Sequence, residues 1–238
     1  MRQHPPELDW PFFEDSHRDF KLRLDAWCNE HLAPPHGNSH HDESRDAVDA
    51  ECVRLVRLLG RGGWLRHAVA GTAYGAASDA IDTRQLCLLR ETLAFHNGLS
   101  DFAFAMQGLG TGAISLAGTH AHKQAILPRV ARGEWISAFA LTEPLAGSDV
   151  GAMQCEARLE GDHYVITGEK TWISNGGIAD VYCLFARTGE APGARGISAF
   201  IITPDMPGFE VAERLVGEAA AAVHKYTRRV GQIGRHFD

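Results

Sequence analysis

The chain has 238 residues, of which 45% are hydrophobic and 22% are charged. This length accommodates one large domain or two ordinary ones, and the apolar content is ample for a core. The formal net charge of −7 argues against a general nucleic-acid binder, because such proteins usually present a basic face. No stretch approaches the roughly 18 uninterrupted apolar residues of a membrane span, so no membrane insertion is expected.

The cysteines are scattered along the chain without any CxxC pair, which indicates neither a disulfide framework nor a zinc site. They are Cys28, Cys52, Cys87, Cys155 and Cys183. His36, His40 and His41 lie close together but have no carboxylate or thiol partner at helical spacing, so a metal site there is disfavoured. The N-terminus has no basic start leading into an apolar run. We therefore expect a reducing compartment, the cytoplasm.

Apolar residues recur at helical spacing in several segments before residue 132, which predicts a set of amphipathic helices. The predicted helices cover residues 16–32, 44–59, 82–97, 100–116 and 119–131. Asp82 and Thr119 are the predicted N-caps of the third and fifth helices. Pro128 is expected to kink or shorten the fifth helix, and Gly133 is expected to close it.

The segment 100–116 is nearly apolar all round, which predicts burial on most of its sides. It also contains a GxGxG pattern at Gly108, Gly110 and Gly112. No strand precedes this pattern, as a dinucleotide-binding fold requires, so close helix packing is favoured over phosphate binding.

After Trp135 the pattern changes to short strand-like runs separated by turn signals. The predicted strands cover residues 136–141, 153–160, 163–167, 170–174, 181–187 and 196–203, and Gly161 with Asp162 forms a predicted hairpin turn. Helices followed by strands indicate an α+β protein, with an N-terminal α-helical domain and a partial β-barrel or sandwich. The expected domains are 1–134 and 135–215, followed by a divergent tail at 216–238.

The first chemically distinctive stretch follows the first predicted strand and reads FALTEPLAGSD. Pro144 cannot donate to a strand ladder, so the strand is expected to end there. The hydroxyls of Thr142 and Ser148, with the flexible Gly147, supply convergent donors that suit a ligand carrying phosphate. An ordinary exit from strand to loop explains these residues equally well.

The second distinctive stretch, GEKTWISNGG, places Trp172 and a hydroxyl immediately before a bend. An indole offers stacking area to an aromatic ligand, and nearby hydroxyl or amide groups orient its polar edge. A tryptophan on a strand is, however, more often a core residue.

Taken together, the two stretches resemble the acyl-CoA dehydrogenase family, which carries T-E-P-x-x-G-S-D and then G-x-K-x-W-I-[ST]-N. Thr142, Glu143, Pro144, Gly147, Ser148 and Asp149 match the first motif, and Gly168, Lys170, Trp172, Ile173, Ser174 and Asn175 match the second. The resemblance covers about residues 16–215. It implies an enzyme that binds FAD and removes hydrogen from the α and β carbons of an acyl-CoA thioester.

The resemblance also implies roles for individual residues. Phe139, Leu141, Thr142, Gly147 and Ser148 would lie along one part of the flavin, with Ser148 also near the CoA portion of the substrate. Trp172, Ile173 and Ser174 would flank the isoalloxazine ring. An electron-transfer flavoprotein would be the electron acceptor. Family members form homo-oligomers, through a domain that the resemblance does not cover.

The family's proton-abstracting Glu lies in a third, C-terminal helical domain, and this sequence departs from the family pattern after Leu215. We therefore expect no catalytic Glu in this chain, and a truncation or frame change near that residue. Glu143 and Glu169 lie inside the motifs and are expected to form structural pairs. A non-catalytic remnant, or a subunit that needs a partner chain, is the alternative function. An oxidase or monooxygenase on the same fold also stays open.

Overall fold

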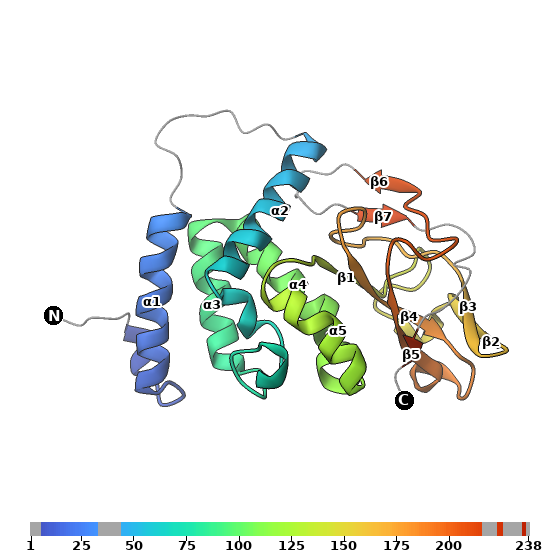
Figure 1. The fold of residues 1–238 in the computed structure, drawn as a ribbon, viewed down its shortest axis with the longest axis horizontal. Coiled ribbons are helices and arrows are strands. Elements are labelled where there is room, and N and C mark those ends of the chain that lie inside the picture. The colour runs from blue at the N-terminus through green and yellow to red at the C-terminus, as the bar shows by residue number, and fades with distance from the viewer. Residues whose placement is uncertain (1–5, 33–43, 216–222, 226–234, 237–238) are drawn as a thin grey trace.

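The computed structural model describes residues 6–32, 44–215, 223–225 and 235–236 (Figure 1). The histidine cluster at residues 36–41 lies outside these ranges. Within them, no helix is long and apolar enough to cross a bilayer. The same residues contain no group of three or more side chains that could hold a metal ion.

Within the described part of the chain, five α-helices precede the first strand, as predicted. They are α1 (Asp15–His31), α2 (Arg45–Arg61), α3 (Thr83–His96), α4 (Gly98–Ala117) and α5 (His120–Ala131). Short 3-10 helices connect the longer elements: η1 (Pro6–Asp9), η2 (Trp64–His67), η3 (Thr72–Tyr74), η4 (Val150–Ala152) and η5 (Gly193–Gly196).

The predicted N-caps are confirmed. A carboxylate oxygen of Asp82 accepts a hydrogen bond from the Arg84 N–H at 2.9 Å, and the Thr119 hydroxyl accepts one from the His122 N–H at 3.2 Å. Pro128 does not shorten α5, which continues to its predicted end. Gly133 follows with a φ of 69°, the left-handed conformation that closes a helix.

Helix α4 lies against β1 and forms the junction between the helices and the sheet. Ala103, Phe104 and Ile114 are buried, in line with the prediction of burial on most sides, while Leu109 and Leu116 lie exposed on one remaining side. An apolar helix composition does not show which side lacks a neighbour. The packing interpretation of the glycines is confirmed at Gly110, where an added Cβ would lie 2.5 Å from the Ser137 Oγ.

The strands form one mixed sheet and one small hairpin-like pair, which confirms the α+β class. The strands are β1 (Ser137–Ala140), β2 (Glu156–Glu160), β3 (His163–Thr167), β4 (Val181–Arg187), β5 (Ile197–Ile202), β6 (Glu213–Leu215), β7 (Val223–Lys225) and β8 (Arg235–His236). In the described residues, the main sheet has the order β3-β2-β4-β5-β8, with β1 also paired to β4, while β6 pairs with β7.

Strand β4 is the centre of the sheet. It pairs in parallel with β1, where Ser137 lies opposite Val181, and antiparallel with β5. The β2–β3 hairpin places Glu160 opposite His163 across the predicted Gly161–Asp162 turn, and Gly161 has a φ of 68°. The parallel pairing places the end of β1 beside β4, with Ala140 opposite Leu184. The loop that follows β1 therefore leaves the sheet next to its central strand.

Residues 170–174 do not form the predicted strand. Trp172 has a φ of 58°, a left-handed conformation that breaks the pleat of a strand. Lys170 is buried while Trp172 is exposed, whereas alternate residues of a strand share one face. The segment is therefore a loop that leaves β3 and returns to β4, and its irregular backbone shapes the candidate site.

One buried core connects the helices with the sheet. It contains Phe20 and Leu24 of α1, Phe104 of α4, Ala138 of β1 and Phe200 of β5. Figure 1 shows the helices gathered beside the strands, with α4 next to β1. Because this core is continuous, α4 and β1 keep a fixed relation to each other and to the loops after β1 and β3.

Candidate functional site

The first wall of the candidate site is the loop that follows β1. A tight turn closes it, because the Glu143 N–H donates to the Ala146 O at 3.0 Å and the Ala146 N–H donates to the Glu143 O at 3.2 Å. Leu145 lies exposed at the tip of this turn. Gly147 and Ser148 follow it and are exposed. The chain therefore presents a glycine and a hydroxyl to solvent directly after the sheet edge.

The second wall is the loop between β3 and β4. Gly168 opens it at a place where any side chain would collide, since an added Cβ would lie 2.7 Å from atoms of Cys155. Asn175 has a φ of 62° and donates from its side-chain amide to the Ser137 O of β1 at 3.0 Å. The Asn175 O in turn accepts hydrogen bonds from the N–H groups of Ile178 and Ala179. Both ends of this loop are thus fixed to the sheet.

The two loops are joined directly by a backbone hydrogen bond. The Thr171 N–H donates to the Thr142 O at 2.9 Å. This bond lies between the two motifs that the sequence separates by more than twenty residues. It places Trp172 next to the strand exit that carries the Thr142 hydroxyl.

A buried ion pair supports the same contact from behind. Lys170 Nζ donates to Glu143 Oε1 at 2.8 Å and to the Leu141 O at 2.9 Å. Glu143 also accepts from the N–H groups of Gln154 and Cys155, at 2.6 Å and 2.9 Å. The prediction that Glu143 forms a structural pair is confirmed. The sequence motif contains both partners, but the bonds to Gln154 and Cys155 have no signal in it.

Cys155 is the buried thiol beside this pair. Burial raises its pKa to about 11; Glu143 also raises it, while Lys170 lowers it. The thiol is therefore protonated at neutral pH and does not act as a nucleophile.

Trp172 is 63% exposed, so the structure excludes its interpretation as a core residue. Its neighbour Ile173 is buried, and Ser174 is half-buried. On the other wall, Leu141 and Thr142 are half-buried, and Phe139 packs its ring 5.1 Å from the ring of Phe185. The structure thus brings both groups of predicted residues to one region, but Ile173 faces the core.

Arg187 at the end of β4 also shapes this region, and the sequence motifs gave no sign of it. Its guanidinium donates to the carbonyl oxygens of Gly151, Met153 and Gly193, at 2.7, 3.2 and 3.2 Å. These bonds hold η4, which begins two residues after Ser148, against η5. Hydrogen bonds therefore hold the first loop at both of its ends: at Thr142 and Glu143, and again at Gly151 and Met153.

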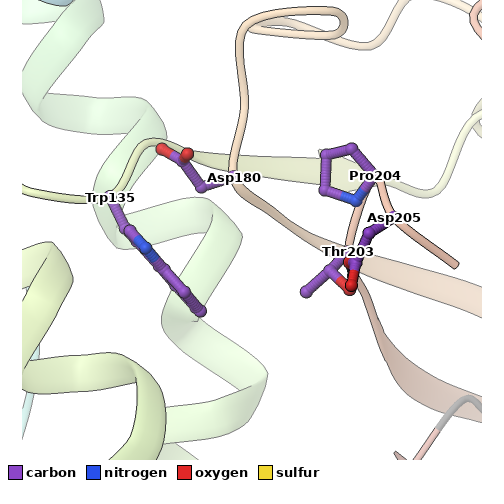
Figure 2. A pocket seen from close by; sticks show the side chains of 5 residues that line it. All are labelled: Trp135, Asp180, Thr203, Pro204 and Asp205. Atoms are coloured by element: carbon purple, nitrogen blue, oxygen red, sulfur yellow. Dashed lines mark hydrogen bonds between the residues drawn. The ribbon is translucent and has the colours of Figure 1, made fainter.

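Two pockets lie near these elements. One, of about 450 Å³, adjoins the Glu143 turn and is also lined by residues 154–156 and 167–169. The other, of about 370 Å³, lies at the start of β1, and Figure 2 shows Trp135 on one side with Thr203, Pro204 and Asp205 on the other. Neither pocket is lined by the predicted site residues, although the first adjoins both loops at Glu143 and Gly168. The candidate site is therefore the surface around the two joined loops.

Comparisons with known proteins identify the family. The model described as the N-terminal domain of acyl-CoA dehydrogenase matches residues 14–134, and the model described as the middle domain matches residues 138–227. The chain therefore belongs to the acyl-CoA dehydrogenase family.

Individual relatives agree with this assignment. Mitochondrial isovaleryl-CoA dehydrogenase of Pongo abelii is 46% identical over 204 residues, which is 84% of this chain and 47% of that protein. Glutaryl-CoA dehydrogenase of Mycobacterium smegmatis superposes with a TM-score of 0.78 at 26% identity, covering 93% of this chain and 55% of that one. An acyl-CoA dehydrogenase of Bacillus anthracis, solved in complex with FAD, has a TM-score of 0.75 at 26% identity, covering 99% of this chain and 39% of that one. The chain spans about half the length of the curated relatives that match most of it.

Proposed function

We propose that this chain forms the flavin-binding part of an enzyme that removes hydrogen from the α and β carbons of an acyl-CoA thioester. The observation that carries this proposal is the bond between the Thr171 N–H and the Thr142 O, which sets the exposed Trp172 beside the loop of Ser148. In this arrangement a flat apolar surface and two hydroxyl-bearing residues adjoin one sheet edge. Such a surface suits a planar cofactor with polar groups on its rim.

The residues present fit FAD. The exposed Trp172 indole offers stacking area, and Ser174 lies half-buried nearby. Among the described residues, the hydroxyls of Thr142 and Ser148 have no hydrogen-bond partner and stay available as donors. Gly147 has open space around it, so a ligand can approach its backbone closely. FAD, when bound, would supply the hydride chemistry, while the protein binds and orients it.

The other contacts that the family resemblance implies are part of the same proposal. We assign Phe139, Leu141, Thr142, Gly147 and Ser148 to one part of the flavin, and Trp172, Ile173 and Ser174 to its ring. Since Ile173 is buried, its contribution comes through its backbone. We assign Ser148, which is exposed, to the CoA portion of the substrate as well.

Glu143, the carboxylate between the two loops, does not suit the role of proton-abstracting base. Both oxygens of Glu143 are engaged, by the Lys170 ammonium and by the N–H groups of Gln154 and Cys155. A base needs a lone pair directed at the substrate proton. We therefore propose that a Glu from outside this sequence, in a longer chain or a partner subunit, completes the reaction.

The wider context is proposed with the same family in view. We propose an electron-transfer flavoprotein as acceptor, fatty acid metabolism as the process, and the cytoplasm as the compartment, where the five unpaired cysteines would stay reduced. We also propose the division into 1–134, 135–215 and 216–238. The gap between the two family-model matches supports its first boundary.

The test begins with the purified chain and added FAD. A yellow protein that keeps its flavin through gel filtration is the expected result, and a chain that stays colourless would overturn the proposal of a flavin site. Anaerobic addition of an acyl-CoA, such as isovaleryl-CoA or glutaryl-CoA, should bleach the visible flavin band once the missing base is supplied.

A second candidate is a non-catalytic module that binds FAD or acyl-CoA. The engagement of both Glu143 oxygens favours it for the chain alone, because Glu143 then has no lone pair left for the substrate proton. This module would turn yellow with FAD and would keep its visible absorption under anaerobic acyl-CoA. Bleaching by the isolated chain would rule it out.

A further inference from the structure

We propose that Lys170 and Glu143 are positioning residues, whose buried pair holds Trp172 and Thr142 at the spacing that flavin binding requires. The inference rests on the proposed function, because it assigns a role within the same site. Neither residue touches the cofactor in this arrangement, since the two side chains are only 1% and 5% exposed. Both act through the backbone of the loops that they join.

The pair is an unusual way to fill a core. Removing two charges from water carries a desolvation penalty that offsets much of their mutual attraction, and apolar residues of similar volume often stabilise a fold as well. Other buried positions around it, such as Cys155 and Ile173, are apolar or nearly so. A general contribution to stability therefore does not explain why two charged residues occupy this position. The specific groups to which they hydrogen-bond do explain it.

Those bonds gather three segments of the chain at one point. Lys170 contributes the start of the second loop, and its ammonium also reaches the Leu141 O, where the first loop begins. Glu143 contributes the turn of the first loop, and its carboxylate holds the N–H groups of Gln154 and Cys155 that precede β2. A lysine ammonium and a carboxylate have enough donors and acceptors for all four contacts. An apolar pair has none.

The conformation of Trp172 depends on this arrangement. A bulky residue with a φ of 58° is strained, and such strain persists only where the surrounding structure fixes it. On one side the chain is held by buried Lys170 and by the bond from the Thr171 N–H to the Thr142 O. On the other side Ile173 is buried. With both neighbours anchored, the indole has no direction left except outward, toward the ligand.

Substitutions of the two residues separate positioning from mere stability. Lys170→Met removes the bonds to Glu143 and Leu141 with little change of length. Glu143→Gln keeps an oxygen toward Lys170 and Cys155 but turns an amide group toward the Gln154 N–H. The double variant removes both charges. Arg158→Met is the matched control. Arg158 Nη2 and Glu156 Oε1 also lie 2.8 Å apart, but both side chains are exposed, and ion pairs on the surface contribute little to stability.

Three quantities are measured on the full 238-residue chain: the FAD dissociation constant by flavin fluorescence, the urea midpoint, and exchange of the Thr171 amide hydrogen. Each single variant should raise the FAD dissociation constant by about ten- to a hundred-fold, the range found for outer partners that orient metal ligands. The double variant should recover part of the urea midpoint but not the FAD affinity. The Thr171 amide should exchange faster in Lys170→Met than in Arg158→Met.

A folded Lys170→Met chain that binds FAD as tightly as the wild type would overturn the inference. So would a double variant in which the FAD affinity rises along with the urea midpoint, because the pair would then act through stability alone. If Lys170→Met does not fold, Glu143→Gln carries the same comparison. If the wild-type chain binds no FAD, the proposed function fails, and amide exchange alone decides the inference. Unchanged exchange at Thr171 in the pair variants would then refute it.

Discussion

Ser137, the first residue of β1, donates its backbone N–H to the side-chain oxygen of Gln107 on α4 at 3.0 Å. Both residues are fully buried. The Ser137 hydroxyl also donates to the Gln107 backbone oxygen at 3.2 Å. The side-chain amide of Gln107 donates to the Ala103 O of the same helix at 3.1 Å, which fixes the orientation of the Gln107 side chain. This connection fixes the helix against the strand whose exit forms the candidate site.

Gln107→Ala should destabilise the fold strongly, because it leaves the buried N–H of Ser137 without an acceptor. An unsatisfied buried donor costs about 1–3 kcal/mol. Urea unfolding followed by far-UV circular dichroism measures the change in free energy of unfolding. Gln124→Ala, on the exposed side of α5, is the control and should leave it nearly unchanged. Equal effects of the two substitutions would contradict the role of Gln107.

Gly110→Ala tests how closely α4 approaches β1. The added methyl would lie 2.5 Å from the Ser137 Oγ and 2.9 Å from the Ala138 N, so helix and strand must separate. Overpacking of this kind costs about 1–3 kcal/mol.

Gly112 on the same helix offers the matched control for this substitution. An added Cβ would meet nothing within 4 Å. Gly112→Ala should therefore stabilise the chain by about 0.5–1 kcal/mol, since alanine has the better helix propensity. Thermal unfolding of the two variants should shift in opposite directions, and a common direction would show that the contact at Gly110 is relaxed.

The sequence predicted most of the helices because their end signals are local. Ser44, Asp82 and Thr119 each accept a hydrogen bond at a helix start, and such caps are visible in the residue types themselves. The hairpin at Gly161 was predictable for the same reason. The loop at residues 170–174 was not, because its apolar and β-branched residues suit a strand while the left-handed Trp172 is imposed by its anchored neighbours.

The other features of the site that the sequence did not predict depend on contacts between residues far apart in the chain. The motifs indicated which two loops form the candidate site, but periodicity does not show that Thr171 bonds to Thr142 or that β1 lies parallel to β4. Arg187 was missed because its three acceptors are backbone carbonyls, which every residue type carries. Likewise, the exposed side of α4 at Leu109 and Leu116 depends on neighbours that composition does not specify.

The contact between α1 and α3 makes part of the stability depend on pH. Burial raises the pKa of Asp82, but hydrogen bonds from His17 and Arg84 outweigh it and lower the pKa below its ordinary value of 3.8. A carboxylate whose pKa is lower in the folded state stabilises the fold above its unfolded pKa. This contribution should be lost as the pH falls through the folded pKa, below pH 3.8.

Asp82→Asn removes the charge but keeps an oxygen that can cap α3. The variant should therefore unfold more readily than the wild type at pH 7, and the difference should shrink as the pH approaches 3. Urea titrations across this range measure it. Asp19→Asn, an exposed site on α1, is the control. A difference that stays constant from pH 7 to pH 3 would contradict the linkage to Asp82.

Trp172 separates the demands of folding from those of binding. Its left-handed backbone is costly for any residue with a Cβ, by about 1–2 kcal/mol, and glycine avoids this cost. The indole itself contributes little to the core because 63% of its surface is exposed. Trp172→Gly should therefore have a larger free energy of unfolding in urea than Trp172→Ala. The expected difference is about 1 kcal/mol, after the greater flexibility of glycine in the unfolded chain is included.

Both Trp172 variants should bind FAD more weakly than the wild type, because each lacks the stacking surface. Ile173→Ala is the reciprocal control, since Ile173 is buried and its truncation should lower stability by about 2–5 kcal/mol. A Trp172→Gly chain that is stable but colourless with FAD would show that this position is shaped for the ligand at the expense of the fold. If Trp172→Gly unfolded earlier than Trp172→Ala, the strain would not be stored at this residue, and the anchoring by Lys170 and Ile173 would have to be reconsidered.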